Sequence, residues 1–167
     1  MARGGHITSI RSHGSPGLVR AMAAAPTLGV MAPTVTRRQV AEALAAARAA
    51  GARTADAGVA GAATDEAGAA RQATAAAVRT SLRWLAQNNP GKAVEIRVPP
   101  YGAVQALGGL THTRGTPPNV IETDPTTWLG LVTGDVEWSA ALADGRVTAS
   151  GTRADLSALL PLPELGD

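Results

Sequence analysis

The length, composition and charge of this chain indicate one small domain with an additional tail. Its 167 residues fit one ordinary domain, since domains usually run to about 100–150 residues. The absence of cysteine excludes a disulfide framework, a thiolate nucleophile and a cysteine-based zinc site. No apolar run approaches the roughly 18 residues that a membrane span requires, so we expect a cytoplasmic protein without stable membrane insertion.

The net charge of +2 conceals a gradient along the chain. Residues 1–38 contain five arginines and no acid, whereas residues 90–167 contain five basic and nine acidic residues. Clustered arginines can neutralise phosphates, and such a leader is one form of arm for nucleic acid or an anionic membrane. Because these arginines are scattered, we favour a disordered basic leader over residues 1–35, or a translated stretch upstream of a start at Met31, and expect no nucleic-acid partner.

Two helices are predicted before the first strand. Residues 36–64 are rich in alanine and glycine, and a helix over 37–50 places Val40, Leu44 and Ala47 on a thin apolar stripe that needs a partner for stability. A linker follows. A second helix is predicted over 65–86, and its apolar face consists of Val78, Leu82 and Leu85.

The period of the pattern changes after the Asn88–Gly91 stop signal. Val94, Ile96 and Val98 alternate with polar residues, which is typical of a half-buried strand. Further strands are predicted over 101–107, over 110–114 as a weaker one, and over 119–123.

Short helices and one strand complete the chain. Asp124 is placed to cap a helix with Pro125 at its first position, which ends near Gly134. Asp135 is predicted to cap the next helix, which ends at Gly145. A strand over 146–150 and a last helix over 155–160 follow. The element order predicts an α+β fold with a sheet of about five strands, largely antiparallel and covered by helices.

Four ordered motifs carry a resemblance to a known family. The run 124–134, with Trp128, and the run 144–151 resemble the C-terminal half of the sterol carrier protein type 2 family. The segments 97–101 and 112–120 are similar to the short bacterial form of this family found in actinobacteria. Together the motifs cover about residues 75–162, and the sterol-carrier-like domain is predicted over 65–163.

The resemblance implies a non-enzymatic lipid-binding and lipid-transport protein without a cofactor. In that family a sheet covered by helices encloses an apolar tunnel, which holds a sterol, a fatty acid or an acyl-CoA. Apolar residues that converge on one interior are the predicted ligand-binding set, with an ordinary core as the alternative for each. They are Ile96, Val98, Val104, Leu107, Trp128, Leu131, Val132, Trp138, Leu142, Val147, Leu156, Leu159 and Leu160.

Two polar residues are candidates for contact with a ligand head group. His112 and Arg114 are two residues apart and thus share a face if the segment is a strand. An arginine such as Arg114 can bind a carboxylate or phosphate, and histidine, the residue type of His112, is the side chain that ordinarily changes charge near neutral pH. The alternative is a loop arginine and a solvent-facing histidine. No nucleophile with a matching base is apparent, and we predict no catalytic and no metal site.

A second class of function stays open at this point. The same fold with a filled core would serve as a protein-interaction or nucleic-acid accessory domain that uses the basic leader as an arm. The identity of a protein partner is not indicated by the residues.

Overall fold

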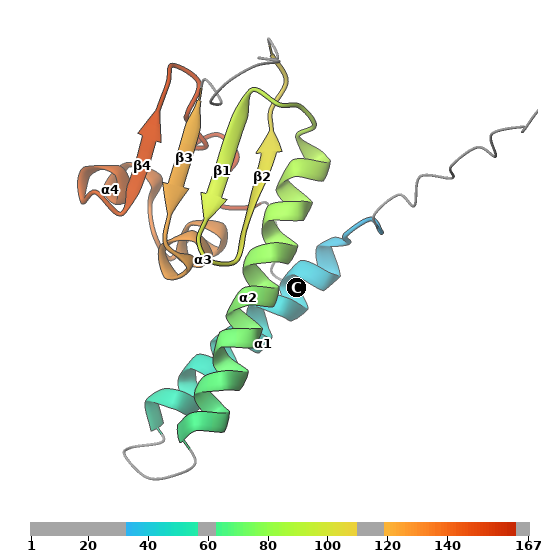
Figure 1. The fold of residues 1–167 in the computed structure, drawn as a ribbon, viewed down its shortest axis with the longest axis vertical. Coiled ribbons are helices and arrows are strands. Elements are labelled where there is room, and N and C mark those ends of the chain that lie inside the picture. The colour runs from blue at the N-terminus through green and yellow to red at the C-terminus, as the bar shows by residue number, and fades with distance from the viewer. Residues whose placement is uncertain (1–32, 57–62, 110–118, 163–167) are drawn as a thin grey trace, which may run out of the picture. The chain divides into compact units, whose positions relative to one another are not determined.

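The computed structural model describes residues 33–56, 63–109 and 119–162, all within one compact unit over Pro33–Asp167. Four helices and four strands lie in these residues (Figure 1). In chain order they are α1 (Arg37–Asp56), α2 (Ala63–Asn88), β1 (Val94–Val98), β2 (Gly102–Ala106), β3 (Val120–Thr123), α3 (Pro125–Thr133), α4 (Trp138–Ala143) and β4 (Val147–Ser150).

The first two helices pack along each other, and α2 also lies against β2 (Figure 1). The predicted apolar stripes are buried, with Val40 and Leu44 on α1 and Val78 on α2 at most 6% exposed. Helix α1 continues past the predicted end at residue 50. Gly51 lowers helix propensity by about 1 kcal/mol without terminating the helix, and the partner α2 supplies the stabilising face.

The sheet is mixed and has the strand order β2-β1-β3-β4. Strand β1 pairs antiparallel with β2 and parallel with β3, and β3 pairs antiparallel with β4. Four of the about five expected strands lie in the described residues, and two of their three pairings are antiparallel as expected, whereas the central pair is parallel. Strand β2 ends beside the start of β1, and β3 starts at that same end of the sheet, so β1 and β3 are parallel. The predicted strand over 110–114 lies outside the described residues.

Strand β3 is held at its beginning by Asn119, which is 6% exposed. Its Nδ2 donates to the carbonyl oxygen of Ala93 at 2.7 Å, and its Oδ1 accepts from the amide of Arg153 at 3.0 Å. Its backbone oxygen accepts from the amide of Glu95 at 3.0 Å. One side chain thus joins β1, β3 and the segment that follows β4.

Helix α3 begins and ends as predicted. The Oδ1 of Asp124 accepts from the amides of Thr126 and Thr127 at 2.9 and 3.0 Å, and Pro125 occupies the first position. Gly134 ends the helix in the left-handed conformation, with φ of 83°. These local contacts place Trp128, Leu131 and Val132 toward the core.

Replacing Asp124 by alanine should lower the free energy of unfolding by about 1 kcal/mol at neutral pH. Partial burial acts to raise the pKa of Asp124, but hydrogen bonds from the Thr127 hydroxyl and from the amides of Thr127 and Thr126 outweigh it, so the pKa lies below the usual 3.8. Because the pKa of Asp124 is lower in the folded than in the unfolded state, its ionised carboxylate stabilises the fold at pH values above the unfolded-state pKa. This stabilisation is lost as the pH falls through the folded-state pKa.

Urea unfolding of wild type and Asp124→Ala at several pH values checks this cap. The difference in the free energy of unfolding between wild type and Asp124→Ala should be constant above about pH 5 and shrink below about pH 4. The variant Asp124→Asn, whose amide oxygen still accepts, should recover part of the loss and show a weaker pH dependence. A difference that persists unchanged in acid would contradict the role of the charged carboxylate.

Two C-terminal predictions are wrong. Asp135 does not cap α4, because its carboxylate accepts from the hydroxyl of Thr133 and from Arg48 instead. The residue before α4 is Glu137, which makes no side-chain cap bond. The predicted helix over 155–160 is a single turn, in which the amides of Leu159 and Leu160 both bond the carbonyl oxygen of Leu156. Too few residues precede Pro161 for the turn to propagate.

Candidate functional site

Most of the predicted ligand-binding residues lie in the packed core. Eight of them are at most 8% exposed and belong to one cluster of contacting side chains. These are Ile96, Val98, Trp128, Leu131, Val132, Trp138, Val147 and Leu156. The structure brings this part of the predicted set together in one interior, as the alternation of the strands and the spacing of the helices indicate.

The other predicted residues lie at the margin of that interior or outside it. Val104, Leu107, Leu159 and Leu160 are half-buried against the core. Leu142 is 37% exposed and does not face the interior. This correction follows from the shortness of α4, a helix of six residues that buries Trp138 and Ala141 and leaves its opposite face in solvent. His112 and Arg114 lie outside the described residues.

An apolar surface groove lies between the α1–α2 pair and α3. Its volume is about 400 Å³. Helix α1 contributes Leu44 and Ala47, and Leu129 and Val136 form the opposite wall. Small residues widen it, since a Cβ atom on Gly51 would have no neighbour within 4 Å. The groove is therefore a concave apolar surface of the size of a ligand pocket.

Two hydroxyl groups at the groove, those of Thr74 and Thr133, already have partners within the protein. Thr74 donates to the carbonyl oxygen of Ala70 at 2.9 Å, and the Thr133 hydroxyl lies 2.9 Å from the carbonyl oxygen of Leu129. Such back-bonding uses the Thr74 donor within its helix, and the Thr133 hydroxyl lies within hydrogen-bond distance of both the Leu129 carbonyl oxygen and the Asp135 carboxylate. The groove thus offers mainly carbon atoms to a bound molecule.

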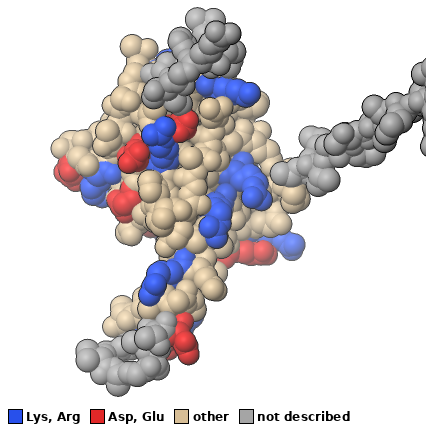
Figure 2. Space-filling model, viewed as in Figure 1, with Lys and Arg blue, Asp and Glu red and all other residues tan. Residues whose placement is uncertain are grey.

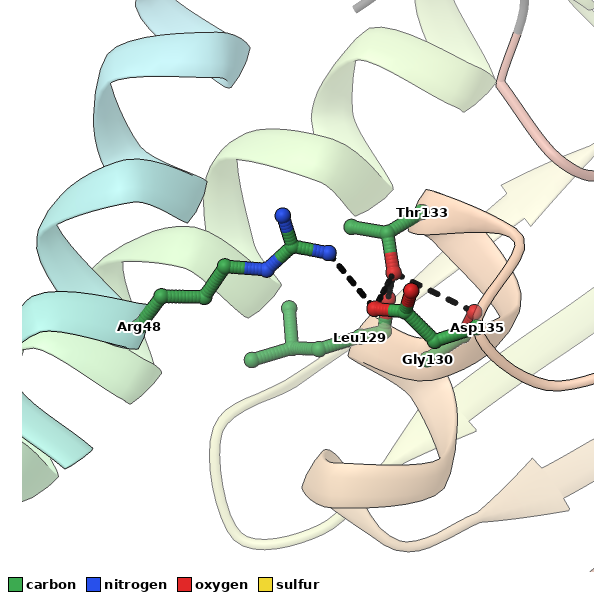
Figure 3. Close-up of polar contacts among 5 residues, drawn as sticks. All are labelled: Arg48, Leu129, Gly130, Thr133 and Asp135. Carbon is green, nitrogen blue, oxygen red and sulfur yellow. Dashed lines mark hydrogen bonds and ion pairs between the residues drawn. The ribbon is translucent and has the colours of Figure 1, made fainter. Parts of the chain in front are cut away.

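One ion pair joins the two walls of the groove (Figure 3). Arg48 reaches from α1 to Asp135, just beyond the end of α3, with Nη2 and Oδ2 2.5 Å apart. The Thr133 hydroxyl and then the Arg48 guanidinium hold the pKa of Asp135 below its usual value. Both partners are solvent-exposed, so the pair contributes little to stability. The pair links α1 to the C-terminal end of α3 at the edge of the groove.

Sequence reasoning identified one wall of this groove and missed the other. The apolar stripe of α1 was recognised from the spacing of Val40, Leu44 and Ala47. Leu129 and Val136 belong to a separate face of the α3 region that carries no periodic signal, since Gly130 and Gly134 interrupt it. Their proximity to α1 is a tertiary contact.

The described residues contain no group of three or more histidine, aspartate or glutamate side chains that could hold a metal ion. None of the described helices has both the length and the hydropathy to cross a bilayer. Smaller surface hollows of about 200 and 320 Å³ are lined in part by predicted ligand residues, Trp138 in the first and Val104 in the second.

These features define an α+β domain with a mixed sheet, a packed apolar core and an apolar groove between helices. Residues 70–162 match the family model described as bacterial SCP ortholog, SCP being sterol carrier protein. The match extends over more than half of the chain, and the chain belongs to this sterol carrier protein-like family. A comparison with curated proteins found no significant match. The family indicates a lipid-binding carrier role in general terms and is generally non-enzymatic.

Proposed function

We propose that this protein binds an apolar, lipid-like ligand and carries it without chemical conversion. The observation that carries the proposal is the apolar groove between α1 and α3, whose volume of about 400 Å³ falls among typical ligand pockets of roughly 300–1,000 Å³. Family membership supports the same class of function. The ligand is a sterol, a fatty acid or an acyl-CoA.

The groove leads toward the predicted interior. Leu44 lines the groove and is also part of the core cluster that contains Trp128 and Val132. A ligand tail that enters between α1 and α3 therefore meets the residues proposed to line the tunnel. In this proposal the tunnel opens when α1 moves away from α3, and Arg48 and Asp135 are the polar link across that opening.

Recognition in such a site depends on apolar area more than on polar contacts. The hydroxyls of Thr74 and Thr133 already have partners within the protein, so a tail gains affinity chiefly by leaving water. Each buried methylene contributes about 0.8 kcal/mol, and four contribute roughly 3 kcal/mol, which corresponds to about a hundredfold in affinity.

Affinity for saturated fatty acids should therefore rise steeply with chain length. We expect about a hundredfold decrease in Kd when four methylene groups are added, until the groove and its extension are filled. Displacement of a fluorescent fatty acid from the full chain, below the critical micelle concentration of each competitor, measures this series. A cholesterol analogue in the same assay separates sterols from acyl chains.

A substitution that fills the groove provides the structural control. Leu129→Trp should weaken fatty-acid binding about tenfold or more, because the larger ring occupies the space of the ligand. The matched control is Ala49→Trp, which adds an indole to an exposed position of α1 that does not line the groove. Equal affinities of Leu129→Trp and Ala49→Trp for the fatty acid would place the ligand outside this groove. If wild type bound neither fatty acids nor the cholesterol analogue, the carrier proposal would be refuted.

The alternative of a nucleic-acid accessory domain rests on the basic leader, residues 1–35. These residues lie almost entirely outside the described ranges, and no described contact favours that function.

A further inference from the structure

Two charged side chains lie at the rim of the otherwise uncharged groove between the α1–α2 pair and α3. Arg48 of α1 and Asp135, which follows α3, are the only charged residues among the described residues that line it. Each of the two side chains is 64% exposed. The rest of the lining consists of apolar, glycine and threonine residues. A ligand whose chain lies in this groove therefore has one place at which its head group meets a charged partner.

Arg48 stands at the boundary between the apolar lining and water. Leu44 lies one helical turn before it on α1, so the two side chains share a face of the helix. Leu44 is 6% exposed, lines the same groove and belongs to the core cluster. A chain that packs on Leu44 thus extends toward the core at one end and reaches the Arg48 guanidinium at the other. This arrangement suits a ligand with an apolar tail and a charged head.

The carboxylate of Asp135 shows which kind of head group this guanidinium accepts. The side chain of Arg48 reaches across from α1, and its Nη2 lies 2.5 Å from Oδ2 of Asp135 (Figure 3). This contact uses Nη2, whereas a guanidinium fork can donate two parallel hydrogen bonds to one carboxylate. A free carboxylate in the groove can adopt the two-bond geometry, because it is not tethered to the segment after α3.

Exchange of Asp135 for a ligand on Arg48 has a low energetic cost. The pair is exposed to solvent, as are basic and acidic side chains elsewhere on the face seen in Figure 2, and exposed ion pairs contribute little to stability. Asp135 also keeps a second partner, since its Oδ2 lies 2.8 Å from the Thr133 hydroxyl. Released Asp135 therefore remains hydrogen-bonded and solvated, and no buried charge is left unpaired.

The charges of the pair also discriminate among head groups. Arg48 and Asp135 together carry no net charge, so the rim offers one positive group beside one negative group. A carboxylate with a single negative charge can bind the guanidinium from the side away from Asp135. A phosphate or coenzyme A head group carries more negative charge and meets stronger repulsion from Asp135. The hydroxyl of a sterol lacks both the charge and the second oxygen that the two-bond contact requires.

We propose that Arg48 binds the head group of the ligand and thereby selects a free fatty acid. This inference rests on the proposed carrier function and names the substrate class of the same groove. The carboxylate of the fatty acid replaces Asp135 on the guanidinium, and its chain lies between Leu44 and Leu129. Arg48 is thus the specificity-determining residue, and Asp135 competes with the ligand for it.

Dodecanoate and dodecanol, two ligands of equal chain length, test the head-group contact. Displacement of an uncharged fluorescent fatty alcohol from the full chain gives the Kd of each, at about pH 8 where the carboxylate is ionised. The ratio of the Kd of dodecanol to the Kd of dodecanoate is the readout, because the contribution of the chain cancels in it. Arg48→Gln should lower this ratio about fivefold, the upper range for an exposed charge pair, and leave the Kd of dodecanol unchanged.

Three further variants complete the test. Arg53→Gln is the matched control, since Arg53 is exposed on α1 and does not line the groove, and it should keep the wild-type ratio. Asp135→Asn removes the competing charge and should raise the ratio about threefold. Arg48→Lys keeps the charge without the fork and should lie between wild type and Arg48→Gln. Circular dichroism verifies the folding of each variant.

An unchanged ratio in Arg48→Gln would overturn the head-group inference and leave the carrier proposal intact. An equal fall in Arg53→Gln would overturn it too, because the effect would then come from the overall charge of α1. If Arg48→Gln and Asp135→Asn tightened the binding of dodecanoate and dodecanol alike, the pair would be a latch across the groove and not a head-group site. Tighter binding of dodecyl phosphate than of dodecanoate would overturn the choice of a carboxylate. If wild type bound none of these ligands, the carrier proposal itself would fail.

Discussion

Replacing Trp128 by alanine should lower the free energy of unfolding by about 3–5 kcal/mol, the range for deleting a buried aromatic side chain. Trp128 is fully buried between helices and sheet. Its Nε1 donates to the hydroxyl of Ser81 at 2.9 Å, and that hydroxyl also bonds the carbonyl oxygen of Ala77 at 2.8 Å. The substitution leaves both a cavity and a broken link between α2 and α3. Urea unfolding followed by far-ultraviolet circular dichroism measures the effect.

Substitutions on both sides of the hydrogen bond test its contribution, with Ser81→Ala removing one oxygen atom and Trp128→Phe removing the N–H together with part of the ring. Ser81→Ala and Trp128→Phe should each cost about 1–3 kcal/mol, the first because a buried indole N–H is left without an acceptor. The double variant should cost less than the sum, since both changes remove the same bond. A loss below about 1 kcal/mol for Trp128→Ala would show that the ring does not hold this core together.

Gly91→Ala should destabilise the fold by about 3 kcal/mol or more. Gly91 has φ of 152°, and a Cβ atom there would lie 1.9 Å from the backbone oxygen of Leu107. The obstacle is the backbone of Leu107 and Gly108, just after β2, so no side chain can rotate away. The midpoint of thermal unfolding should fall accordingly.

The matched control for Gly91 is Gly51→Ala within α1. A Cβ atom at Gly51 has no neighbour within 4 Å, and alanine stabilises a helix by about 1 kcal/mol relative to glycine. The same chemical change should therefore have opposite signs at the two positions. Unchanged or increased stability of Gly91→Ala would indicate that the close approach of Gly91 to Leu107 does not exist in solution.

Several elements were predictable because their signals are local. The alternation of Val94, Ile96 and Val98 predicts β1, and each of these residues is buried. Asp124, Pro125 and Gly134 predict both ends of α3. Caps and periodicity depend on atoms within one turn or one strand, and no distant contact is needed to form them.

Errors occurred where distant contacts compete with local ones. Asp135 has the residue type and position of a helix cap, but Thr133 and Arg48 bind its carboxylate. Leu142 has the spacing of a core residue, but α4 has no neighbour on that side in the described structure. The segment over 155–160 has helical residues but ends at Pro161 after one turn.

The amino-acid sequence by itself determined an α+β domain of the sterol carrier protein type with an apolar interior and capped helices, because burial preference and capping are properties of short segments. Tertiary structure alone decided the parallel pairing of β1 with β3 and the groove between α1 and α3. Its contacts join residues far apart, such as Trp128 with Ser81, 47 positions away, and Arg48 with Asp135, 87 positions away. Which distant surfaces meet depends on how the whole chain buries its apolar area, and no local pattern encodes it.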